Sequence, residues 1–182
     1  MKSKVFSVSI IIIAIILLLS CIIVNVSADT QDNATKMLTL SKGGIIMNYP
    51  SDWGYSQASS NDSVMAISKL DSIDSAGIGQ VNINVEKRAI SENLSSYLEN
   101  TYKSMEYDSS FELISSGEVA IGTNTAYEYI YTSTDNGVIR EHKAVWFDKN
   151  GQACVLLYSA PLDQFEANLY VFDYIVKDIQ FA

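Results

Sequence analysis

A long, uncharged and mainly apolar stretch lies near the start of the chain, followed by a short polar stretch and then by strand and helix patterns. Residues 5–26 carry no charged side chain, and Lys2 and Lys4 precede them. Basic residues before an apolar segment are typical of a secretory signal or a membrane anchor. We therefore predict that residues 1–28 export the rest of the chain, that residues 29–36 form a polar linker, and that residues 37–182 form a domain.

The export segment has three alternative fates. As a helix, residues 5–26 would measure roughly 33 Å at about 1.5 Å per residue, which is enough to anchor the chain in the membrane. Val26-Ser27-Ala28 is a small-residue cleavage site, which favours removal and secretion. Leu18-Leu19-Ser20-Cys21 resembles a lipobox, so lipidation at Cys21 is the third alternative. An anchor would hold the domain at the outer face of the cytoplasmic membrane, because Lys2 and Lys4 stay inside.

Strand patterns begin the domain. Residues 37–40 and 45–48 flank a glycine-containing turn at 41–44 and predict a hairpin. Residues 64–70 and 79–87 are predicted strands, and in the second one Val81, Ile83 and Val85 alternate with polar residues.

Two helices are predicted from apolar residues at helical spacing. The first spans residues 94–105, with Ser91 or Asn93 as its N-cap. The second follows Pro161, and Asp163 and Glu166 have the spacing of a capping box. Its apolar stripe is Phe165, Leu169, Phe172, Val176 and Ile179.

Between the helices the pattern predicts an antiparallel meander of four strands. These are residues 111–121 (broken near Gly117), 126–134, 138–148 and 153–160, and two Asn-Gly pairs mark its later turns. Residues 153–160 are apolar on both faces, so both faces of the sheet need cover. We predict an α+β fold, a central antiparallel sheet covered by helices on both faces (an α/β/α sandwich).

Charge limits the classes of partner. The chain has 182 residues, a formal net charge of −9 and a pI of about 4.4, which argues against binding nucleic acid. After residues 1–28, Cys154 is the single cysteine, so no internal disulfide is expected there. Cys154 lies in a predicted strand and is interpreted as a buried apolar residue.

No catalytic or zinc-binding motif is present in the sequence. His142 is the single histidine, a zinc site needs several such ligands, and no G-x-S-x-G motif occurs. We interpret His142 as a strand residue hydrogen-bonded to a neighbour or lying on an interaction surface. The alternative is a hydrolase built around His142 and Glu141.

Three other groups of residues are candidate sites. Asp71 and Asp74 could supply oxygens to calcium or another ligand, although their spacing matches no EF-hand, and a solvated loop is the simpler interpretation. Tyr127, Tyr129 and Tyr131 alternate along one strand, either as an interaction surface or packed beneath a helix. Asn33, Asn61 and Asn93 begin glycosylation sequons in a chain predicted to be exported.

The order of these motifs resembles the PsbP-like family. The resemblance covers residues 38–181 and rests on Tyr49-Pro50-Ser51-Asp52-Trp53, on residues 137–142 and 156–161, and on the C-terminal Ile175–Phe181. It implies an α/β/α sandwich with a non-catalytic role. Photosynthetic relatives are lumenal subunits that support calcium and chloride retention in photosystem II, and a nuclear family of similar fold binds a small GTPase.

The family's calcium ligands have no matching motif in this sequence, so no cofactor is carried over. The resemblance and the export segment together lead to one hypothesis. The domain is an accessory or binding module for an envelope or membrane protein complex.

Overall fold

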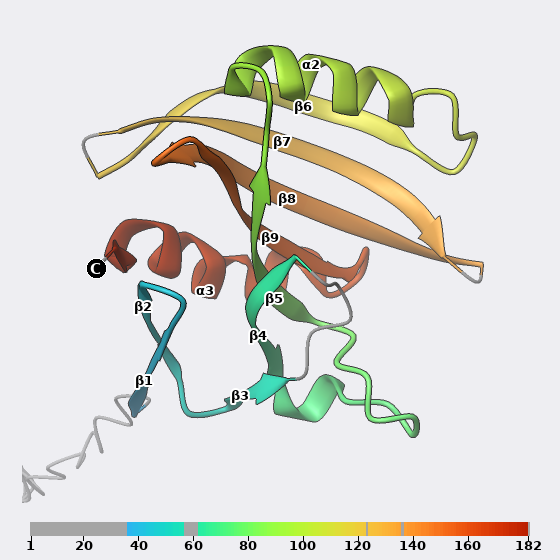
Figure 1. Cartoon of the computed structure of the whole chain (residues 1–182). Helices are drawn as coiled ribbons and strands as arrows, with labels where there is room; N and C mark the ends of the chain where they lie inside the picture. Colours follow the sequence, from blue (N-terminus) through green and yellow to red (C-terminus); the bar gives the residue numbers. More distant parts are fainter. Residues whose placement is uncertain (1–35, 57–61, 123, 136, 182) are drawn as a thin grey trace, which may run out of the picture. The chain divides into compact units, whose positions relative to one another are not determined.

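The computed structural model describes residues 36–56, 62–122, 124–135 and 137–181. Its largest element of structure is a seven-stranded antiparallel sheet with the order β3-β4-β5-β9-β8-β7-β6 (Figure 1). Its strands are β3 (Trp53–Ser56), β4 (Ser63–Lys69), β5 (Asn82–Ala89), β6 (Glu112–Ile121), β7 (Asn124–Asp135), β8 (Val138–Lys149) and β9 (Gln152–Pro161). With two helices, this sheet confirms the predicted mainly antiparallel α+β fold.

The predicted N-terminal hairpin forms a second, three-stranded sheet. Strand β1 (Met37–Lys42) pairs with β2 (Ile45–Pro50), and β10 (Gln180–Phe181) pairs with the other edge of β2. Strand β2 is not part of the main sheet. Its buried side chains pack in one core with helix α3 (Phe165–Asp178). Asn48 Nδ2 donates a 2.8 Å hydrogen bond to Asp178 Oδ2 and links the hairpin to the end of that helix.

The two helices differ in how well their caps were predicted. Helix α2 spans Leu94–Met105 as expected, and Asn93 Oδ1 accepts a hydrogen bond from Ser96 N. The capping box predicted for α3 is wrong, because its N-cap is Gln164 without a side-chain cap bond. Gln164 N donates to the carbonyl of Pro161, so the turn after β9 is one residue longer than predicted and leaves Asp163 outside the cap.

Several elements differ from the prediction. Strands β3 and β10 were not expected, and a single-turn 3-10 helix, η1 (Leu70–Ser72), begins the predicted loop. The break near Gly117 is also wrong, because β6 pairs continuously there. The irregularity lies at Ile114, an extra residue between the pairs that Leu113 and Ser115 make with β7.

Alternating residues of the central strands contribute to two separate apolar cores. Phe147, Cys154, Leu156 and Tyr158 share a core with Phe165 and Phe172 of α3. Trp146, Val155 and Leu157 share the other with Leu98 and Tyr102 of α2. Cys154 is buried among apolar side chains, as predicted.

Residues 1–35 include the predicted export segment and nearly all of the predicted linker, and they lie outside the described residues. Neither α2 nor α3, the helices in the described part of the chain, is long and apolar enough to cross a membrane.

Candidate binding pocket

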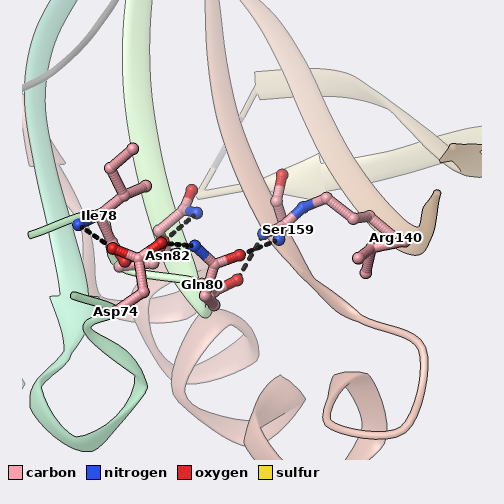
Figure 2. A pocket seen from close by; sticks show the side chains of 8 residues that line it. Asp74, Ile78, Gln80, Asn82, Arg140 and Ser159 are labelled. Carbon is pink, nitrogen blue, oxygen red and sulfur yellow. Dashed lines mark hydrogen bonds between the residues drawn. The ribbon is translucent and has the colours of Figure 1, made fainter. Parts of the chain in front are cut away.

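A polar pocket lies beside the loop 73–80 at one end of β5, β8 and β9 (Figure 2). Arg140 in β8 belongs to the same alternating set as Ala144 and Trp146, so the pocket opens on the sheet face that α2 contacts further along the strands. Its volume is about 450 Å³, within the roughly 300–1,000 Å³ range of small-ligand sites. The polar lining residues are Asp74, Gln80, Asn82, Arg140 and Ser159.

The loop wall of the pocket is organised by Asp74. Its Oδ1 accepts hydrogen bonds of 2.9 Å from the backbone N–H groups of Ala76 and Ile78, and its Oδ2 accepts one of 2.8 Å from Gln80 Nε2. These bonds, the one from Ile78 above all, hold the pKa of Asp74 below its usual value. The carboxylate is therefore ionised at neutral pH and used in shaping the loop.

Gln80 connects this loop to strand β8. Arg140 Nη1 donates a 3.0 Å hydrogen bond to Gln80 Oε1, and Arg140 Nη2 donates to the Gln80 carbonyl oxygen. Figure 2 shows Gln80 between Asp74 and Arg140, with hydrogen bonds on both sides. The positive Arg140 and the negative Asp74 thus both line the pocket, and each is hydrogen-bonded to the side-chain amide of Gln80.

Two apolar side chains also line the pocket. Ile78 is 60% exposed and Val138 is 48% exposed. Apolar side chains together with a few fixed polar groups are the usual lining of a small-ligand site.

His142 lies next to the pocket but is not among its lining residues. Its ring stacks on Tyr131 with 4.7 Å between centroids, and its Nε2 and Nδ1 lie 2.8 Å from Ser133 Oγ and 2.7 Å from Ser159 Oγ. Burial, together with the charge of Arg140, lowers the pKa of His142 to about 4. The ring is therefore neutral at pH 7 and joins two strands neighbouring its own through hydroxyl groups.

The structure separates the two residues named for the hydrolase alternative. Glu141 and His142 are adjacent in β8, so their side chains point to opposite faces of the sheet. Both ring nitrogens of His142 contact serine hydroxyls rather than a carboxylate.

Replacing His142 with glutamine should change how stability depends on pH. The folded state holds the histidine pKa near 4, below its unfolded value of 6.5, so the unfolded chain binds more protons between these values and the folded state loses stability as pH falls. We expect this group to remove about 2–3 kcal/mol from the free energy of unfolding between about pH 7 and about pH 4. Urea titrations at both pH values should show a smaller decline in H142Q, whereas equal declines would contradict the neutral, buried ring.

The two aspartates considered as candidate calcium or ligand groups, Asp71 and Asp74, have different surroundings. Asp71 forms an exposed 3.1 Å ion pair with Lys69, and of the two aspartates only Asp74 lines the pocket. Within the residues that the structure describes, no group of three His, Cys, Asp or Glu side chains is placed to hold a metal ion.

The three tyrosines of β7 contact the core beneath α2. Tyr129 stacks on Tyr102 of α2 with ring centroids 3.7 Å apart, and Tyr131 is buried, which raises its pKa to about 12. Tyr127 is half-buried against the same core. Of the sequons, Asn93 is exposed at the N-cap of α2, while Asn33 and Asn61 lie outside the described residues.

Sequence analysis missed most residues of the pocket. The prediction included Arg140 and Asn82 only as positions within strands and assigned neither of them to a site. The one signal for the loop wall was the apolar Ile78, which lies between two glycines in a polar segment. The alternation of apolar and polar residues does not explain such a position.

The sequence model of the PsbP-like protein family matches residues 6–181. A search of curated proteins finds no match. Among solved structures, cyanobacterial PsbP (CyanoP) from Synechocystis sp. PCC 6803 has a TM-score of 0.57 and 16% identity, over 81% of this chain and 94% of that one. LpqN of Mycobacterium tuberculosis, described as involved in cell envelope biogenesis, has a TM-score of 0.56 and 16% identity, over 83% and 93%.

A third similar structure is the Ran-binding protein Mog1p of Saccharomyces cerevisiae. Its TM-score is 0.54 and its identity 9%, over 81% of this chain and 96% of that one. At such identities the likeness establishes a shared fold.

Proposed function

This chain belongs to the PsbP-like protein family, and on that premise we propose that it is a non-enzymatic accessory module that binds a protein of the cell envelope. The observation that carries the proposal is the pocket. Its charged and amide side chains are fixed by hydrogen bonds, and the aliphatic Ile78 and Val138 beside them are exposed to water. Similar folds occur in a Ran-binding protein and in a protein of cell envelope biogenesis, which supports a binding role by analogy.

The proposed location is the outer face of the cytoplasmic membrane, or beyond it after release. Its support is in the sequence, where Lys2 and Lys4 precede the apolar residues 5–26. Residues 37–182 would then be the exported domain and residues 29–36 the linker that carries it.

We also infer that the two helices cover opposite faces of the main sheet, as an α/β/α sandwich requires. The support is the division of neighbouring strand residues between two cores. Phe147 shares a core with α3, whereas Trp146, next to it in β8, shares one with α2. Since successive strand residues point to opposite faces, each helix would shield one of them.

Co-purification from gently solubilised native membranes tests the binding role. The full-length tagged chain should recover an envelope protein in reproducible amounts, and Val138→Asp should reduce that recovery because it places a charge beside the pocket. Ile139→Asp is the matched control, since Ile139 is 50% exposed and lies on the other face of the same strand. Equal recovery by both variants, or no recovered protein, would argue against this function.

A further inference from the structure

We propose that a cavity beneath helix α2 binds a small neutral ring compound that carries a hydroxyl group, such as a phenol. The α2 cavity shares no lining residue with the polar pocket, so this inference goes beyond the proposed function and does not depend on it. Three features carry it: a volume that suits one ring, buried tyrosine hydroxyl groups with unused hydrogen-bonding capacity, and a buried carboxylate at the same cavity.

The size and the walls of the α2 cavity suit a single ring. The cavity lies between α2 and the strands β5, β7, β8 and β9, and its volume is about 180 Å³. An apolar cavity of about 150 Å³ in an engineered protein is large enough to bind benzene. Most of the walls here are aromatic or aliphatic, namely Tyr102, Tyr131, Ala144, Trp146, Val155 and Leu157. A ring placed among them would be removed from water.

Two buried tyrosines of the lining have hydrogen-bonding capacity that the protein does not use. Tyr131 is 8% exposed, and its hydroxyl group makes no hydrogen bond to any residue that the structure describes. The hydroxyl oxygen of Tyr102 accepts the bond from Trp146 Nε1, but its own O–H has no acceptor within the described part of the chain. A buried hydroxyl group without a partner costs free energy. Both tyrosines would therefore gain from an acceptor in the cavity.

Glu86 of β5 supplies a buried acceptor to the same cavity. It is 7% exposed, and its Oε1 and Oε2 accept hydrogen bonds of 2.7 Å from Asn84 Nδ2 and Arg88 Nη2. A carboxylate has about four acceptor positions, so Glu86 can accept a further bond. Its charge is already paired with Arg88, and burying a second cation would cost more than burying a neutral donor. A hydroxyl group both donates and accepts, so one such group can serve Glu86 and a tyrosine together.

Phenol and toluene are the probes, because a hydroxyl group in one replaces a methyl group of similar size in the other. The full-length chain in nonionic detergent is titrated with each compound, the free concentration is set by equilibrium dialysis, and the methyl NMR signals of Leu157 report occupancy of the cavity. We expect phenol to bind at least as tightly as toluene. A cavity without hydrogen-bonding groups would favour toluene, because the phenol hydroxyl would be buried without a partner.

Three variants locate the binding. Tyr131→Phe removes the hydroxyl group and keeps the ring, so it should weaken phenol about fivefold and leave toluene unchanged. Tyr127→Phe is the matched control, since Tyr127 is half-buried on the same strand and outside the cavity lining, and it should alter neither affinity. Ala144→Leu fills the cavity and should abolish the binding of both compounds.

Several results would overturn the inference. These are tighter binding of toluene, no response of Leu157 to either compound, and equal phenol affinities in Tyr131→Phe and Tyr127→Phe. Phenol binding that persists in a folded Ala144→Leu would also overturn it. If Ala144→Leu does not fold, the two tyrosine variants decide the question. None of these results changes the recovery of an envelope protein through Val138, which lines the other pocket.

Discussion

Replacing Phe172 with alanine is expected to lower the free energy of unfolding by about 3–5 kcal/mol. Phe172 is fully buried in α3, where its ring lies 5.9 Å from that of Tyr158 in β9. Removing it leaves a cavity between the helix and the sheet that the surrounding residues cannot fill without moving. Urea unfolding followed by far-UV circular dichroism measures the loss.

Tyr170→Ala is the matched control for this change. Tyr170 belongs to the same helix and is 62% exposed, so its truncation should alter the free energy of unfolding by no more than about 0.5 kcal/mol. Similar losses in the two variants would mean that α3 does not hold the core through Phe172.

Leu98→Ala should cost about 2–5 kcal/mol, through the second core. Leu98 is fully buried in α2 and packs in the cluster that contains Trp146 and Val155. Trp146 Nε1 also donates a 3.0 Å hydrogen bond to Tyr102 Oη, so the helix is tied to β8 by both apolar and polar contacts.

Glu99→Ala serves as its control, since Glu99 is the next residue of the helix and is exposed. The same urea titration should show little change for Glu99→Ala. If Leu98→Ala lowered the free energy of unfolding by less than about 1 kcal/mol, that would contradict the packing of α2 against Trp146 and Val155.

The sequence predicted those elements whose signals are local. Helix α2 was placed correctly because its apolar stripe and the Asn93 cap lie within one segment. The last two hairpins of the meander followed from the Asn-Gly pairs, and Asn150, Gly137 and Gly151 have the positive φ angles that such turns require.

Elements that depend on distant partners were missed. Strand β10 has two residues and exists because β2 pairs with it from the far end of the chain. Strand β3 follows Pro50 closely, and its sequence Trp53-Gly54 alone indicates the end of a turn. It is a strand because it pairs with β4.

The pocket was missed for the same reason. Gln80 and Arg140 are 60 positions apart, and only the strand order β5-β9-β8 brings their segments together. Periodicity reports which face of a strand is buried, but it carries no information on which strands are neighbours. The sequence therefore supported a binding module without locating its pocket.

Site-specific photo-crosslinking in native membranes tests most directly whether binding occurs at this pocket. A benzophenone amino acid would replace either Val138, which lines the pocket, or Ile139, which is similarly exposed on the opposite face. The account predicts a discrete crosslinked envelope protein from position 138 that is absent from position 139. A crosslink from 139 and none from 138 would contradict it.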